Sequence, residues 1–185
     1  MRQQILPRLR GLLWKLLGNH RLAAFFIFDF VWLAAVLGRE SWLWLTCLLI
    51  ALMFAATPKI LWRQRWQLLG LVVLGCLLEL ATVNFGVIRF TGTDWIPLWL
   101  ILLWVGFSGM ALVVFDYLRK RFLIAAVLGA IFGPITYFAG ERLGAAELQV
   151  NFLPALVVYS LFWSVMMVNI AAIVQPHQTP AEGRS

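Results

Sequence analysis

Apolar residues occur along this chain in long unbroken blocks that short polar stretches separate. Two of the blocks read LLGLVVLGCLL, over 68–78, and IPLWLILLWVGF, over 96–107. The strands of a membrane β-barrel would alternate apolar and polar residues, so these blocks predict α-helices. A membrane-spanning helix needs roughly 20 apolar residues. Six blocks come close to this length, near 22–37, 41–57, 66–85, 95–115, 122–140 and 152–174.

The composition supports a membrane protein. Charged residues make up 12% of the chain and hydrophobic residues 63%, whereas a soluble domain carries about 25% charged residues. The 10 Trp and 14 Phe suit a protein with long boundaries between lipid and water. We therefore expect an all-α fold, a polytopic membrane bundle of six transmembrane helices.

The basic residues alternate between the two sides of the predicted bundle. Three of them, Arg39, Arg89 and Arg142, fall on one side. The other twelve fall on the opposite side: Arg2, Arg8, Arg10, Lys15, Arg21, Lys59, Arg63, Arg65, Arg119, Lys120, Arg121 and Arg184. The positive-inside rule then places both termini in the cytoplasm. The net charge of +7 is explained by these loops, and we expect no nucleic-acid partner.

The two ends of the chain differ from the blocks between them. Over residues 1–20, Ile5, Leu9, Leu12 and Leu16 share one helical face, and basic residues lie off it. This pattern is typical of an amphipathic helix lying in the cytoplasmic interface. Residues 175–185 are polar and predict a disordered cytoplasmic tail. Between them, 21–174 is the expected transmembrane domain.

A glycine-rich stretch, GAIFGPITYFAGERLGA over 129–145, lies in the fifth block. On one helix its glycines fall within about 60° of each other, and small residues on one face let two helices approach closely in lipid. We expect helix packing here, with a kinked helix lining a cavity, or a short re-entrant break, as the alternatives. Tyr137 lies beside the stripe and is expected to point into the bundle. The expected packing residues are Gly129, Gly133, Gly140 and Gly144.

Acids within the blocks are the main candidates for a binding site. Asp29 lies near the middle of the first span, where an ionisable group costs roughly 2.5–3.5 kcal/mol. It should therefore face the interior, either protonated or paired. For Asp29 and Glu79 a hydrogen bond between helices and a ligand or proton site both stay open. Asp116 should pair with Arg119 or Lys120. The candidate ligand-binding residues are Asp29, Trp32, Glu79, Asn84, Arg89, Tyr137, Glu141 and Arg142.

Several kinds of chemistry find no support in the sequence. The two histidines, His20 and His177, lie outside the predicted spans, which argues against histidine-ligated iron or haem within the bundle. Neither a phosphate-binding loop nor a nucleophile elbow is present. We read Cys47 and Cys76 as small buried apolar residues. We expect no metal site and no cofactor, and catalytic residues stay unknown.

Two segments resemble a known family. Ile96–Ser108 and Gly129–Ala145 are similar to the bacterial inner-membrane family catalogued as domain of unknown function twenty-eight seventy-eight, over roughly 21–174. The resemblance implies the topology and a bacterial inner-membrane location, and supplies no reaction. An acid in the third span also fits, with Glu79 where the family leads us to expect Asp. The marks of the resemblance are Pro97, Trp99, Trp104, Gly133, Pro134, Tyr137, Gly140 and Gly144.

These patterns lead to an expectation about function. We expect an inner-membrane accessory or binding protein that holds a lipid-like or small amphipathic molecule near Asp29, Glu79 and Tyr137. Its expected partners are membrane lipids, with another inner-membrane protein left open. One alternative is a small transporter or transporter subunit, whose architecture would resemble the substrate-binding component of an energy-coupling-factor transporter. Another is a lipid-modifying enzyme, although we lean away from enzymatic activity.

Overall fold

The computed structural model describes residues 20–175, and helices account for most of them. The expected all-α fold class is confirmed. The α-helices are α2 His20–Gly38, α3 Leu43–Ala56, α4 Pro58–Arg63, α5 Arg65–Asn84, α6 Leu98–Val114, α7 Phe122–Arg142 and α8 Phe152–Ile173. Two short 3-10 helices are η1 Arg39–Trp42 and η2 Phe115–Leu118. The predicted interfacial helix at 1–20 and the predicted tail at 175–185 lie outside the described residues, except for His20 and Gln175.

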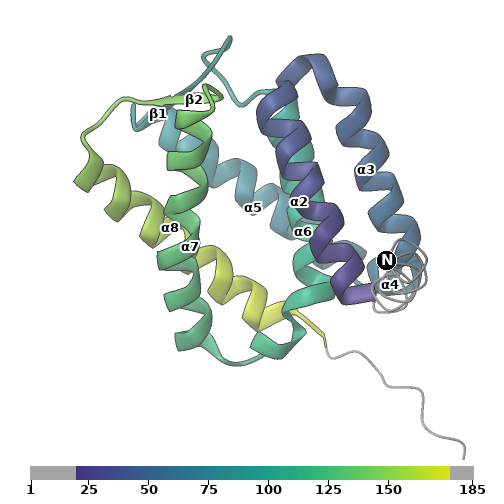
Figure 1. The fold of residues 1–185 in the computed structure, drawn as a ribbon. Coiled ribbons are helices and arrows are strands. Elements are labelled where there is room, and N and C mark those ends of the chain that lie inside the picture. Colours follow the sequence, from purple (N-terminus) through teal and green to yellow (C-terminus); the bar gives the residue numbers. More distant parts are fainter. Residues whose placement is uncertain (1–19, 176–185) are drawn as a thin grey trace, which may run out of the picture.

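Successive long helices run in opposite directions (Figure 1). Both ends of the described chain therefore lie at one end of the bundle, which we name the tail end because Gln175 lies there. The opposite end carries strands β1 Ile88–Phe90 and β2 Ala146–Leu148, and we name it the strand end. The predicted helical blocks agree with the six long helices to within about three residues at every boundary.

Five stretches of the described residues are long and apolar enough to cross a membrane. The first of them, His20–Ala56, contains the whole antiparallel pair α2 and α3 (Figure 1). Taken alone, α3 has 14 residues, fewer than the roughly 20 that a bilayer requires. The helix ends where Pro58 follows Thr57, because a residue before proline disfavours helical backbone angles, and Thr57 indeed leaves them with φ −136° and ψ 42°.

The two strands were not expected from the sequence. They pair antiparallel, with Ile88 opposite Leu148 and Phe90 opposite Ala146. Arg89 lies directly opposite Glu147, an arrangement of opposite charges that favours this register. Strands of three residues are too short to show the alternation by which a strand is recognised.

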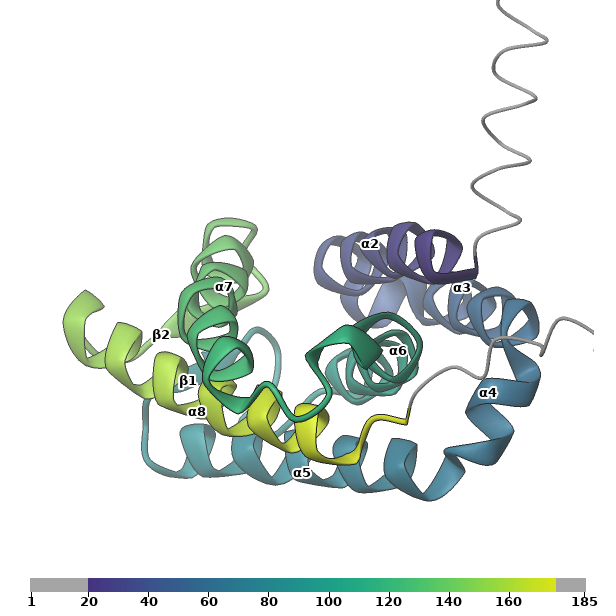
Figure 2. The ribbon, with the colours of Figure 1, turned by 90° about the horizontal axis from the view of Figure 1, so that it is seen from below.

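The helices form two groups that α5 joins. The first group consists of α2, α3 and α6, and the second consists of α7 and α8. Figure 2 shows α5 running beneath both groups, and it packs against α6 and α8. In contrast, α2 and α7 lie on the same side of the molecule but share no extended packing. The arrangement leaves a space between α2 and α7 that the side chains of α6 close from behind.

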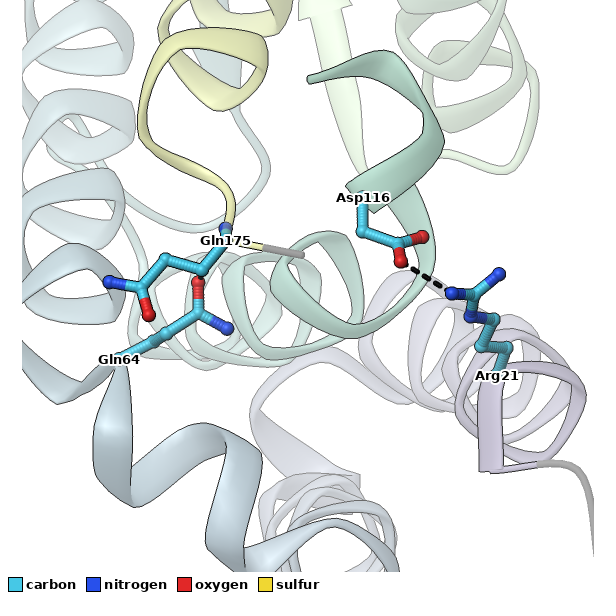
Figure 3. Close-up of polar contacts among 4 residues, drawn as sticks. All are labelled: Arg21, Gln64, Asp116 and Gln175. Carbon is cyan, nitrogen blue, oxygen red and sulfur yellow. Dashed lines mark hydrogen bonds and ion pairs between the residues drawn. The ribbon is translucent and has the colours of Figure 1, made fainter. Parts of the chain in front are cut away.

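Polar contacts hold the helix ends together at the tail end (Figure 3). Asp116 on η2 forms an ion pair with Arg21 at the start of α2. The expectation that Asp116 pairs with Arg119 or Lys120 was therefore wrong, because the chain turns between η2 and α7 and presents Asp116 to α2. The side-chain oxygen of buried Gln64 accepts a hydrogen bond of 3.2 Å from the backbone N–H of Gln175. This bond joins the α4–α5 junction to the end of α8.

Candidate ligand-binding groove

A cavity of about 580 Å³ lies between α2, α6 and α7, and we name it the groove. Phe90 and Ala146 of the strands line it at the strand end, and Phe115 and Tyr117 of η2 line it near the tail end. The groove therefore runs along most of the length of the helices. Its volume lies within the range of about 300–1,000 Å³ that is usual for small-molecule sites.

The mouth of the groove opens sideways rather than at either end of the bundle. Phe25 of α2 and Phe132 and Ile135 of α7 line the groove, yet they are 42%, 60% and 54% exposed. These exposed side chains belong to two helices that share no extended packing. If α2 and α7 cross a membrane, for which the stretches that contain them are long and apolar enough, the mouth faces the lipid chains.

Aromatic rings from α6 and α8 form the deep wall. The rings of Trp104 and Trp163 stack with their centroids 5.5 Å apart, and Phe107 meets Trp163 edge-on at 5.0 Å. Glycines allow this approach. A Cβ at Gly133 would lie 2.0 Å from the Trp163 ring, and a Cβ at Gly75 would lie 2.3 Å from the Trp104 ring.

The glycine stripe of α7 therefore divides into two parts. At Gly129, as at Gly133, α8 lies against the helix, and a Cβ would come within 2.3 Å of the Trp163 carbonyl oxygen. The expectation of close packing was wrong at Gly140 and Gly144, where a Cβ would meet nothing within 4 Å. Gly140 instead lines the groove. Gly144 lies beyond the end of α7 and adopts φ +72°, a turn conformation that favours glycine.

A buried polar pair links α5 to α7 at the groove. Glu79 is 1% exposed, and the hydroxyl of Tyr137 donates a hydrogen bond to its Oε1. Trp104 and Thr82 lie beside the same carboxyl group, but Glu79 Oε2 and Trp104 Nε1 make no hydrogen bond. Tyr137 also stacks on Tyr159 with ring centroids 3.6 Å apart. The groove thus contains a carboxyl oxygen that no described residue satisfies.

Asp29 and Trp32 of α2 line the same groove. Asp29 is exposed, and within residues 20–175 it has no hydrogen bond or ion pair. Asp29 faces the groove, as expected, but no described residue pairs with it. The groove has no facing helix at its mouth, so Asp29 points into an open space. The structure brings together Asp29, Trp32, Glu79 and Tyr137 of the predicted site.

The other four predicted residues lie at the strand end and do not line the groove. Glu141 Oε1 accepts a hydrogen bond of 3.1 Å from the backbone N–H of Leu148. Arg89 lies 3.8 Å from Asp94 in an exposed pair, and Asn84 and Arg142 are exposed. The structure does not bring these four residues to the groove, because they lie at the ends of α5 and α7 and in the pair of strands.

Some groove residues were not identified as site residues from the sequence. Trp99 and Trp104 were noted only as marks of the family resemblance, and Phe107 and Trp163 were not noted at all. One signal in the sequence could have found them. The large aromatic rings of α6 and α8 fit only where a neighbouring helix has a glycine, as at Gly75 and Gly133. Among the described residues, no three His, Cys, Asp or Glu side chains come together as metal ligands.

The fold is that of a polytopic helical protein whose helices are apolar enough to cross a membrane. The chain belongs to the family described as Protein of unknown function (DUF2878), whose model matches residues 21–168. The matched segment contains every residue that lines the groove. No curated protein and no solved structure matches the chain.

Proposed function

We propose that this protein binds an elongated lipid-like or small amphipathic molecule in the groove. The observation that carries the proposal is a cavity of about 580 Å³. Its mouth lies between two helices of membrane-spanning length, α2 and α7, that do not pack against each other. A molecule dissolved in the membrane could enter such a site without crossing water. An aqueous substrate would instead need a mouth at one end of the bundle.

The shape of the groove favours a long, narrow ligand. Along α7 its lining extends from Leu128 to Gly140, and twelve residues of helix rise roughly 18 Å. That length is more than half of the roughly 30 Å thickness of a bilayer core. Nearly all of the lining is apolar or aromatic, with a few polar groups, which is the usual composition of a site that holds an amphipathic ligand.

We also propose a bacterial inner-membrane location with both termini in the cytoplasm. Within residues 20–175 the strand end carries Arg39, Arg89 and Arg142. The tail end carries seven basic residues, Arg21, Lys59, Arg63, Arg65, Arg119, Lys120 and Arg121. This asymmetry supports a cytoplasmic tail end by the positive-inside rule. Membrane lipids are the proposed partners.

A transporter subunit is the second candidate function. The observation that favours it is the division into two helix groups, because the α7–α8 group packs on the rest of the molecule through α5, η2 and the strand pair, and not along the length of α2 or α3. A relative movement of the two groups would widen or close the groove. Co-purification of a stoichiometric membrane partner, with binding that depends on it, would favour this alternative over a stand-alone binding protein.

Native mass spectrometry of the full chain from mild detergent tests the binding proposal. Leu128 lines the groove, whereas its neighbour Val127 is 48% exposed and points away from it. We expect lipid-sized adducts on the wild type and on Val127→Trp, and their loss from Leu128→Trp, because an indole at 128 fills the space. If Leu128→Trp folds and retains the same adducts, the groove is not the binding site.

A further inference from the structure

The groove is lined by two acidic side chains and, among the described residues, by no basic one. Among the described residues, its only charged side chains are Asp29 and Glu79, and no Lys, Arg or His lines it. Glu79 is 1% exposed, and its Oε2 has no hydrogen-bond partner. Asp29 has no partner either. Acids in a membrane interior are costly unless something compensates them, and here the compensating group is absent from the described chain.

The walls around these acids are electron-rich aromatic rings. Trp32 of α2, Trp104 of α6 and Trp163 of α8 line the groove together with Tyr137. An organic cation is attracted to the face of an indole or phenol ring, and several such rings together recognise quaternary ammonium groups. The aromatic wall and the acids thus favour the same kind of ligand head group.

We propose that the groove selects an amphiphile whose head group is an amine or another organic cation, attached to a single apolar chain. This inference rests on the proposed binding function and specifies its ligand class. An anionic head group would meet Asp29 and Glu79 with no cation nearby to compensate it. A phosphodiester head group would leave its phosphate equally unpaired. A cationic head group in the groove pairs with Asp29, compensates the buried Glu79 carboxyl group, whose Oε2 has no hydrogen bond, and contacts the rings.

The test compares three probes that share one chain and differ in the head group: hexadecylamine, hexadecanol and hexadecanoate. Each is titrated into the full chain in mild detergent, and the intrinsic fluorescence of the groove tryptophans reports binding. We expect hexadecylamine to bind at least about tenfold more tightly than hexadecanoate, since ion pairing and contacts with aromatic rings both favour it. Leu128→Trp should abolish the signal for all three probes.

Variants of the acids test the charge selection. Asp29→Asn and Glu79→Gln should each reduce the preference for the amine, whereas Glu40→Gln should leave it unchanged. Glu40 is exposed on η1 and lies outside the groove, so it serves as a matched control. If Glu79→Gln fails to fold, Asp29→Asn decides the question, because Asp29 is exposed and has no hydrogen bond or ion pair within residues 20–175.

The outcomes separate this inference from the function on which it rests. Equal affinity for the three probes, lost in Leu128→Trp, overturns the charge selection and leaves the binding function standing. A preference for hexadecanoate overturns it in the same way. If no probe binds and the wild type carries no lipid-sized adduct in native mass spectrometry, both proposals fail.

Discussion

At the scale of single residues, two glycines of one helix should respond oppositely to the same change. Gly133→Ala places a Cβ where the Trp163 ring lies, and overpacking of this kind typically costs about 1–3 kcal/mol. Gly140→Ala meets nothing within 4 Å and should leave stability unchanged or slightly raised, because alanine favours helix over glycine. Thermal unfolding in detergent, with both variants beside wild type, measures the difference.

Equal melting of the two glycine variants would contradict the packing of α8 on Gly133. Loss of ligand binding in Gly140→Leu without loss of stability would agree with its position in the groove. Ile131→Trp is the control for added bulk on α7, because Ile131 is 53% exposed and lies outside the groove.

The Glu79–Tyr137 hydrogen bond provides a second prediction at this scale. Tyr137→Phe removes the donor to Glu79 Oε1 and leaves both oxygens of a buried carboxyl group unsatisfied. Losing one partner of a buried hydrogen bond costs about 1–3 kcal/mol, so the variant should unfold at a lower temperature. Tyr159→Phe is the matched control, because Tyr159 stacks on Tyr137 but its buried hydroxyl has no partner.

Tyr159→Phe should therefore be neutral or slightly stabilising. A larger loss of stability from Tyr159→Phe than from Tyr137→Phe would mean that the Tyr159 hydroxyl contributes more to stability than the hydrogen bond from Tyr137 to Glu79 does.

The sequence could predict part of this site and not the rest. The helical phase of the glycines placed them on one face, and Gly129 and Gly133 do meet a neighbouring helix. Phase alone cannot say where α7 ends, so Gly144 was assigned to a face although it lies in a turn. Likewise, a carboxyl group in an apolar block predicted a site at Asp29 and Glu79, but only the fold brings Trp163 beside them.

At the scale of elements, a contact at the strand end joins the two helix groups. Arg39, in the turn between α2 and α3, donates a hydrogen bond of 2.7 Å to the carbonyl oxygen of Gly144. Thr91 donates to the same oxygen at 2.8 Å. Arg39 also adopts φ +47°, a left-handed conformation that costs a residue other than glycine roughly 1–2 kcal/mol. The contact to Gly144 offsets that strain.

Two substitutions at Arg39 separate the contact from the strain. Arg39→Ala loses the hydrogen bond and keeps the strained backbone, whereas Arg39→Gly loses the bond and relieves the strain. We expect Arg39→Gly to be more stable than Arg39→Ala by about 1 kcal/mol. Both should exchange the amide hydrogens around Ala145 faster than wild type, as hydrogen–deuterium exchange would show. Unchanged exchange in both variants would mean that Arg39 does not stabilise the strand end.

The elements themselves were largely predictable, for a clear physical reason. A helix in lipid must satisfy its own backbone and so needs a long apolar block, and each of the six long helices coincides with one block. The elements that were missed are short: α4, β1 and β2 are set by Pro58, by turns and by cross-strand contacts. Which helices pack together was not predictable either, because apolar faces in lipid look alike.

At the scale of the whole molecule, the two helix groups lie on one side of α5 (Figure 2). The groove lies between them, lined by side chains of α2, α6 and α7. This arrangement makes the number of membrane crossings a functional question. If α2 and α3 both cross, the mouth between α2 and α7 lies within the lipid. If the pair only dips into the membrane, part of the mouth meets water and the proposed route for lipids is shorter.

Cysteine accessibility in intact cells decides this topology. In a background with Cys47→Ala and Cys76→Ala, single cysteines at Glu40, Glu147 and Arg63 are tested with a membrane-impermeant thiol reagent. Glu40 and Glu147 lie at the strand end and Arg63 at the tail end, and all three are exposed. Because basic residues gather at the tail end, we expect labelling at Glu40 and Glu147, and at Arg63 only after the membrane is permeabilised. Labelling at Glu147 without Glu40 would mean that α2 and α3 do not cross, and labelling at Arg63 alone would reverse the orientation.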